Sequence, residues 1–232
     1  MVFEIRNAWL MAAFLLLVPT LPARAQNSST QFLPEIDTYV KLQPNIRFVF
    51  QAKDTREGGE PTEAEIGPSM EFYLKPLLRL ETTVLDLDGA KSRPLVLSIG
   101  YRYVPSPGKP PTNRMEPVAT LHFPIKGQIL ISDRNRADLD WSSGNFTWRY
   151  RNRLTLERAF KIHSYPLTPY VSAEAFYESQ YQKWSTAALY AGCLFPIGKH
   201  VQFDPYYEHQ NNTGKKPNQQ LNQFGLILNL YF

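Results

Sequence analysis

The chain has 232 residues, a net charge of +4, 43% hydrophobic residues and 13% aromatic residues. This charge excess is too small to favour nucleic acid as a partner, and the single cysteine, Cys193, cannot form an internal disulfide bond. The mean hydropathy is −0.34. No segment beyond the N-terminal leader approaches the roughly 18 consecutive apolar residues of a spanning helix, so helical spans are excluded there.

The chain begins with a segment that is typical of exported proteins. A charged leader precedes the apolar run 10–18, and an A-x-A site ends at Ala25. This pattern predicts a secretory signal peptide over residues 1–25, cleaved after Ala25. The apolar run is about half of the roughly 20 residues that a spanning anchor needs. We expect residues 26–34 to form a periplasmic segment before the first strand.

The rest of the chain alternates apolar and polar residues between turn signals, which is the two-residue period of β-strands. Tilted spanning strands need about 9–11 residues each, and an even strand number is typical of closed bacterial barrels. We therefore predict one closed antiparallel up-and-down transmembrane β-barrel over residues 35–232, with about 12 strands, or ten as the alternative. The predicted strands cover residues 35–42, 46–53, 63–74, 77–85, 94–104, 116–123, 128–136, 146–159, 167–177, 184–195, 201–210 and 221–232.

The connections between these strands differ in length at the two ends of the predicted barrel. With the C-terminus on the periplasmic side, the long polar connections 105–115, 137–145 and 211–219 fall outside, and the short turn 196–199 falls inside. Long outer loops and short inner turns are the usual asymmetry of outer-membrane barrels. The connection 54–62 does not fit, because twelve strands place this long loop on the periplasmic side. Either the first four strands are misassigned or the barrel has an unusual inner loop.

The clearest alternation, over residues 146–157, separates aromatic and leucine side chains from a run of arginines. Arginines facing lipid would each cost roughly 2–4 kcal/mol near the midplane, so they must point into the lumen. Like charges this close need counter-ions, which carboxylates on other strands can supply. The candidate lumen charge network comprises Arg102, Arg134, Arg136, Arg149, Arg151, Arg153, Glu65, Glu71, Glu174, Asp204 and Glu208.

Aromatic residues near the predicted strand ends suit the two interfaces of a membrane, where amphipathic rings lie at headgroup level. Stacking on sugars or bases is the alternative interpretation. The residues are Phe146, Trp148, Tyr181, Trp184, Phe195, Tyr206, Tyr207, Tyr231 and Phe232.

The last strand ends on a phenylalanine, and large apolar residues alternate with small or polar ones before it. This ending resembles the signal that closes bacterial outer-membrane barrels. It predicts two partners, outer-membrane lipid and the barrel-assembly machinery, the latter through the terminal strand. The residues of this C-terminal assembly signal are Phe224, Leu226, Leu228, Leu230 and Phe232.

Several segments between residues 116 and 232 form a recognisable set, of which the arginine run 149–153 and the Ala-Glu-Ala-Phe stretch 173–176 are the most specific. With the segments 132–136 and 204–210, they resemble the uncharacterised bacterial outer-membrane family labelled domain of unknown function 2490. The resemblance implies a barrel in the outer membrane. It implies no activity, because the family has no established one.

The sequence offers little for enzymatic chemistry. His200 and His209 have no partner at metal-ligand spacing, and the carboxylates are explained as partners of the arginines. We expect a protein that is not an enzyme and needs no cofactor or metal: a narrow pore or a structural protein of the Gram-negative outer membrane. The alternatives are a lipid-modifying enzyme that uses His122 or a lumenal carboxylate, and a soluble periplasmic β-barrel or sandwich that binds a ligand.

Overall fold

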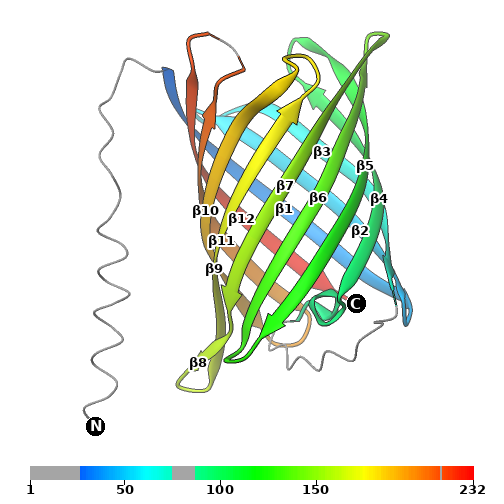
Figure 1. The fold of residues 1–232 in the computed structure, drawn as a ribbon, viewed down its shortest axis with the longest axis vertical. Helices are drawn as coiled ribbons and strands as arrows, with labels where there is room; N and C mark the ends of the chain where they lie inside the picture. Colours follow the sequence, from blue (N-terminus) through cyan, green and yellow to red (C-terminus); the bar gives the residue numbers. More distant parts are fainter. Residues whose placement is uncertain (1–26, 75–86, 215) are drawn as a thin grey trace.

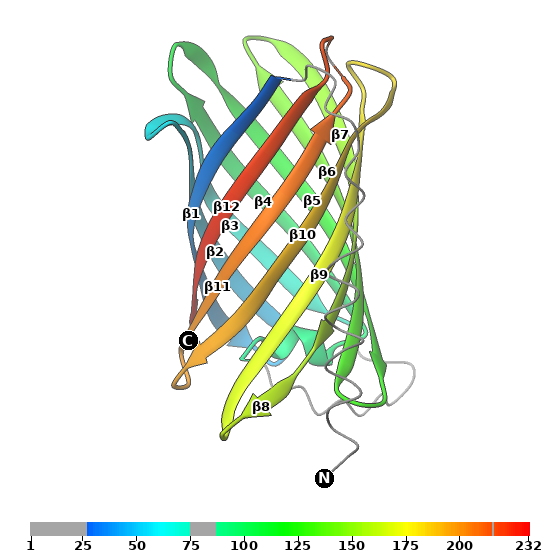
Figure 2. The same ribbon diagram turned by 90° about the vertical axis from the view of Figure 1, so that its left-hand side faces the viewer.

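The computed structural model describes residues 27–74, 87–214 and 216–232. These residues form a tilted, closed β-barrel, shown from two sides in Figures 1 and 2. Its ring consists of β1 (Asn27–Gln43), β2 (Ile46–Glu57), β3 (Glu60–Tyr73), β4 (Leu95–Ser106), β5 (Lys109–Ile125), β6 (Ile129–Ser142), β7 (Asn145–Arg158), β9 (Tyr165–Glu178), β10 (Lys183–Ile197), β11 (Val201–Asn212) and β12 (Gln219–Tyr231).

Two short elements lie off this ring. The strand β8 (Phe160–Ile162) pairs with β9 beyond the end of β7, and the short 3-10 helix η1 (Gly89–Ser92) lies at the barrel end that holds the C-terminus (Figure 1). Within the described ranges, no helix has the length and apolar character needed to cross a membrane.

The ring closes through one parallel pair. Successive ring strands run antiparallel, whereas β1 runs parallel to β12 from Asn27 opposite Gln219 to Tyr39 opposite Tyr231. The described ring has eleven strands, and an odd number of alternating strands requires one parallel contact where the first meets the last. The predicted all-β closed barrel of about 12 strands is confirmed, with the difference that the ring is mixed rather than wholly antiparallel.

The predicted strand 77–85 lies outside the described residues, and β3 pairs directly with β4. The first three strands therefore run in the opposite sense to that in a twelve-strand ring. Of the two explanations for the connection 54–62, the structure supports misassigned strands rather than an unusual inner loop. β2 and β3 continue to a tight turn at Gly58 and Gly59, whose φ angles of 60° and 90° suit glycine. This turn lies at the same barrel end as the connection between β11 and β12 (Figure 1).

The first strand begins earlier than the alternating pattern suggested. Residues 27–34 were expected in a separate segment over 26–34, but they form the first half of β1 and pair with β12. This pairing covers the edge of β12, which would otherwise present unpaired backbone groups. The start of β1 and the C-terminal Phe232 consequently lie at opposite ends of the barrel (Figure 1). The predicted signal peptide, residues 1–25, lies outside the described residues.

The two faces of the strands have opposite characters. The exterior carries large exposed apolar side chains, among them Phe224 at 54%, Leu226 at 38% and Phe232 at 66% exposure. The interior carries buried charged and polar side chains, including Arg102, Glu116 and others on every side of the ring. This is the inverse of a soluble globular protein, and it follows directly from the period of two in the strands.

Candidate functional site

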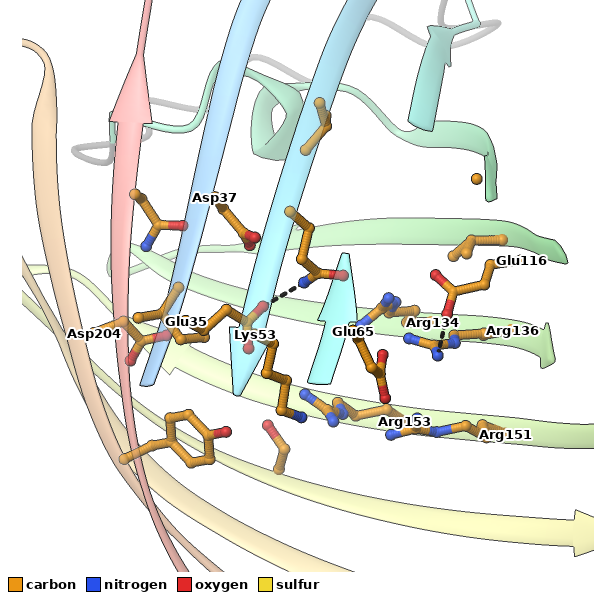
Figure 3. A pocket seen from close by; sticks show the side chains of 18 of the residues that line it. Glu35, Asp37, Lys53, Glu65, Glu116, Arg134, Arg136, Arg151, Arg153 and Asp204 are labelled. Atoms are coloured by element: carbon orange, nitrogen blue, oxygen red, sulfur yellow. Dashed lines mark hydrogen bonds and ion pairs between the residues drawn. The ribbon is translucent and has the colours of Figure 1, made fainter. Parts of the chain in front are cut away.

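The barrel encloses a cavity of about 710 Å³ that is lined by side chains from all the described ring strands. Figure 3 shows part of this lumen, with arginines of β6 and β7 facing carboxylates of β1 and β11. The residues of the predicted lumen network line this cavity, apart from Glu174, which bonds to arginines that do. Those that line it are Arg102, Arg134, Arg136, Arg149, Arg151, Arg153, Glu65, Glu71, Asp204 and Glu208.

Glu174 of β9 bridges two of the three inward-facing arginines of β7, which we call the β7 ladder (Arg149, Arg151 and Arg153). Its Oε1 accepts a hydrogen bond from Arg151 Nε at 2.9 Å, and its Oε2 accepts one from Arg153 Nη2 at 2.7 Å. The Tyr190 hydroxyl donates a further hydrogen bond to Oε2 at 2.7 Å. The register places Glu174 directly opposite Arg153, so cross-strand pairing positions this carboxylate.

Asp138 of β6 is the second centre of the network, and sequence reasoning missed it. The residue is 0% exposed, accepts hydrogen bonds from Arg149 Nε at 2.9 Å and Nη2 at 2.7 Å, and also bonds Arg136. Residues 137–145 were predicted as a loop, but β6 continues to Ser142 and keeps Asp138 facing inward. The continued alternation of charged residues beyond Arg136 was the signal for this.

Glu116 of β5 is the third buried carboxylate of this wall. It accepts a hydrogen bond from Arg136 and lies 3.5 Å from Arg102 Nε. Within the described residues, five arginines of β4, β6 and β7 thus share three carboxylates, and a sixth, Arg134, forms no ion pair. We call this set the basic wall: Arg102, Arg134, Arg136, Arg149, Arg151 and Arg153, with Glu116, Asp138 and Glu174.

The other predicted carboxylates do not pair with the β7 ladder. Glu65 bonds Arg114 at 3.1 Å, and Glu71 forms an ion pair with Arg47 at 2.7 Å. Asp204 accepts a hydrogen bond from the Tyr170 hydroxyl at 3.0 Å. The predicted network is therefore divided among several smaller groups.

An acidic wall lies across the lumen from the basic wall. It consists of Glu35 and Asp37 on β1 and Glu208 on β11, together with Lys53 on β2, which lies in electrostatic range of Glu35 and Glu208. Glu35 accepts a hydrogen bond from Gln51. No ion pair is formed by these three carboxylates among the described residues, and the buried Asp37 Oδ1 has no hydrogen-bond partner there.

The helix η1 narrows the lumen at the end that holds the C-terminus. Asp88 caps η1 through Ala90 N at 2.9 Å and bonds Arg47 Nη1 of β2 at 2.6 Å. Lys91 bonds Glu157 of β7 at 2.9 Å. These contacts attach η1 to two strands that are far apart in the ring. Burial alone would raise the pKa of the Asp88 carboxyl, but the charges of Arg47 and Lys91 lower it below its ordinary value.

His122 and His200 each form a hydrogen bond to a backbone carbonyl oxygen. His122 lines the lumen as expected, and its Nδ1 donates to the Arg93 carbonyl oxygen at 2.7 Å. His200 bonds the Tyr231 carbonyl oxygen in the same way. In the described ranges, no group of three or more histidine, cysteine or carboxylate side chains is arranged to hold a metal ion.

Two of the aromatic residues that were predicted to lie at the membrane interfaces point into the lumen instead. Tyr206 and Tyr231 line the lumen, because β11 and β12 put even and odd positions on the inner face, respectively. Gly225 makes room for Tyr206: a Cβ at this glycine would lie 2.0 Å from the ring. On the exterior, Trp148 stacks on Tyr177 with ring centroids 5.5 Å apart.

Comparison with known proteins gives one family. Residues 89–221 match the family described as "Protein of unknown function (DUF2490)", which is more than half of the chain. The resemblance of the C-terminal half is thereby confirmed, and the match extends towards the N-terminus to include η1 and β4. No curated protein matches the chain.

Proposed function

The chain belongs to the DUF2490 family, and from this premise we propose that it is a narrow pore of the bacterial outer membrane. In this proposal the signal peptide is removed after Ala25 and the barrel spans the bilayer with the C-terminus on the periplasmic side. The lumen then forms a charged path for small solutes, and no catalytic role is assigned to it.

The observation that carries the proposal is the character of the exterior. Apolar side chains such as Ile36, Ile99, Leu154 and Leu189 are all exposed on the outer face. Contiguous apolar surface of this extent marks a membrane or protein contact rather than a surface in water. Outer-membrane barrels show such a band, with a polar interior. A soluble ligand-binding barrel would carry the opposite distribution.

Exterior aromatic rings support the same environment. Trp148, Tyr177 and Trp184 form a cluster in which Tyr177 and Trp184 have ring centroids 5.8 Å apart. Tryptophan and tyrosine are favoured at membrane interfaces because each ring combines an apolar body with a polar group. We assign this cluster to one of the two lipid–water interfaces.

The pore part of the proposal rests on the lumen. Its cavity of about 710 Å³ is lined by charged side chains of both signs. Such a lining interacts more favourably with water and polar solutes than an apolar core would. The ion pairs and η1 restrict its width, as expected for a barrel with few strands. We therefore expect a small conductance rather than the wide channel of a large porin.

The proposed orientation has a consequence for the N-terminal end. If the C-terminus faces the periplasm, the start of β1 lies at the cell surface, because β1 runs parallel to β12. An epitope inserted at Gly58–Gly59 should bind antibody on intact cells, as should one placed before Asn27. An epitope in the turn 126–128 at the other end serves as the control and should bind only after permeabilisation.

The direct test is to express the full chain in a Gram-negative host, fractionate the cells and record the purified protein in planar bilayers. We expect heat-modifiable protein in the outer membrane, with small single-channel currents. Recovery of folded protein in the soluble periplasm would refute the membrane barrel. Stable insertion without any current would refute the pore and leave a sealed structural barrel.

A further inference from the structure

The charges of the lumen are separated across its width. The basic wall lies on β4, β6 and β7, and the acidic wall lies on β1 and β11. Figure 3 shows part of this arrangement, with Arg134 and Arg153 across from Glu35 and Asp37. In the ring order, four strands separate β1 from β6 on one side and four separate β7 from β1 on the other. β1 therefore stands directly opposite the β6–β7 pair, and an electric field runs across the cavity between them.

The basic wall has positive charge in excess. Its six arginines stand against three carboxylates, and five of the six share the ion pairs of Glu116, Asp138 and Glu174. Arg134 lies among the other arginines, faces the cavity and forms no hydrogen bond or ion pair among the described residues. A guanidinium in this position has five N–H donors available for an anionic group.

The acidic wall has negative charge in excess. Glu35, Asp37 and Glu208 are buried carboxylates that line the cavity. Lys53 lies in electrostatic range of Glu35 and Glu208, and Arg153 of the basic wall also lies in range of Glu208. Lys53 also faces Glu65, its register partner on β3. The Lys53 ammonium is shared by Glu35, Glu65 and Glu208. One ammonium cannot compensate these three carboxylates, so a cationic group of a solute would be attracted here.

We propose that the lumen binds a small zwitterionic solute, with its anionic group at Arg134 and its cationic group at Glu35 and Glu208. This inference rests on the proposed pore and names the class of solute that the pore takes. Tyr206 lies beside this acidic group on the lumen wall, where its ring offers an ammonium a further favourable contact.

The two-sided arrangement favours a zwitterion over a simple ion. An anion bound at Arg134 would feel the carboxylates across the cavity, and a cation at Glu35 would feel the arginines. A solute with both charges satisfies both walls at once, and its zero net charge removes the overall barrier to entry. Its two groups must also be separated, because the walls stand on opposite sides of the cavity.

The test uses three probes of equal chain length: 6-aminohexanoate, hexanoate and hexylammonium. Binding is measured by calorimetry on the full folded chain in detergent, with heat-modifiable mobility as the check of folding. We expect 6-aminohexanoate to bind at least tenfold more tightly than either singly charged probe. Equal binding of hexanoate would overturn the proposal in favour of a plain anion site, and equal binding of hexylammonium in favour of a cation site.

Substitutions locate the site. Arg134→Gln and Glu35→Gln should each weaken 6-aminohexanoate binding at least tenfold, whereas Lys126→Gln, in an exposed turn, should leave it unchanged. Where Glu35→Gln does not fold, Glu208→Gln tests the same wall. Unchanged affinity in the folded wall variants would overturn the assignment. Conductance is scored separately: currents without binding refute this inference alone, and binding without currents refutes the pore alone.

Discussion

Asp138 on β6 and Arg149 on β7 are joined by two hydrogen bonds. The fully buried carboxylate accepts one from Arg149 Nε at 2.9 Å and one from Arg149 Nη2 at 2.7 Å. The same carboxylate also bonds Arg136 and lies 3.9 Å from Arg151. Three arginines therefore share this carboxylate, although Arg136 also pairs with Glu116 and Arg151 with Glu174. Losing it would leave Arg149 without any ion pair among the described residues.

We predict that Asp138→Ala strongly destabilises the barrel. Removing one partner of a buried ion pair costs about 3–5 kcal/mol, and water in the lumen reduces this figure. The measurement is the urea midpoint of the refolded protein, followed by heat-modifiable mobility. Asp54→Ala is the matched control, because its pair with Arg56 is largely exposed and such pairs contribute about 0–1 kcal/mol. Equal midpoints for the two variants would contradict the central role of Asp138.

The facing of β7 was predictable because it depends on local sequence. Arg149, Arg151 and Arg153 line the lumen as predicted, since a period of two assigns inner and outer faces without knowledge of the neighbouring strands. The same reasoning failed for Asp138. Residues 137–145 are rich in Asp, Ser and Gly and were taken for a loop, although Ala137, Leu139 and Trp141 continue the apolar face of β6. β6 and β7 extend together to a tight turn with Ser143 and Gly144 at positive φ.

Partners that are distant in sequence could not be predicted. Arg47 bonds Asp88, 41 positions away, and Lys91 bonds Glu157, 66 positions away. These contacts depend on where η1 enters the lumen and on the stagger of the ring, neither of which leaves a periodic signal. The direction of the first three strands was also predicted wrongly. Counting one further strand at 77–85 gave an even number of strands, and this reversed the predicted direction of β1, β2 and β3.

We predict that replacing Arg149, Arg151 and Arg153 together with serine widens the lumen and changes its selectivity. The variant loses three cations and leaves Asp138 and Glu174 less compensated. Conductance should rise, and the reversal potential in a salt gradient should shift towards cations. A triple serine variant of Lys126, Lys161 and Lys199, in exposed turns or β8, controls for net charge. The same conductance and selectivity as the parent would show that the arginines do not limit the path.

We predict an acid-induced opening that depends on Asp88. Burial opposes ionisation of Asp88, but Arg47 and Lys91 lower its pKa below the ordinary value. A carboxyl with a lowered folded pKa stabilises the folded arrangement above about pH 4 and loses this contribution as the pH falls further. The contact of η1 with β2 should therefore persist at neutral pH and weaken in acid. Single-channel conductance measured from pH 7 to pH 3 should rise in the acidic part of this range.

The Asp88→Asn variant separates this effect from general acid unfolding. It removes the charge that Arg47 contacts at 2.6 Å, so conductance at pH 7 should already be raised and the acid step should be smaller. Asp54→Asn, at an exposed pair, should keep the parental pH profile. An Asp88→Asn profile that coincides with the parental one would show that η1 does not control the opening.

The last prediction concerns the closing strand. Phe232 is 66% exposed on the outer face, its backbone N–H donates to Tyr39 O at 2.8 Å, and its carbonyl oxygen accepts from Lys41 N at 2.9 Å. A charged side chain here would face lipid in the proposed membrane and weaken the contact that closes the ring. Phe232→Asp should therefore abolish heat-modifiable protein in the outer membrane while export to the periplasm continues. Phe160→Asp, in β8 outside the ring, should assemble normally. Normal assembly of Phe232→Asp would show that the terminal residue is dispensable for recognition and closure.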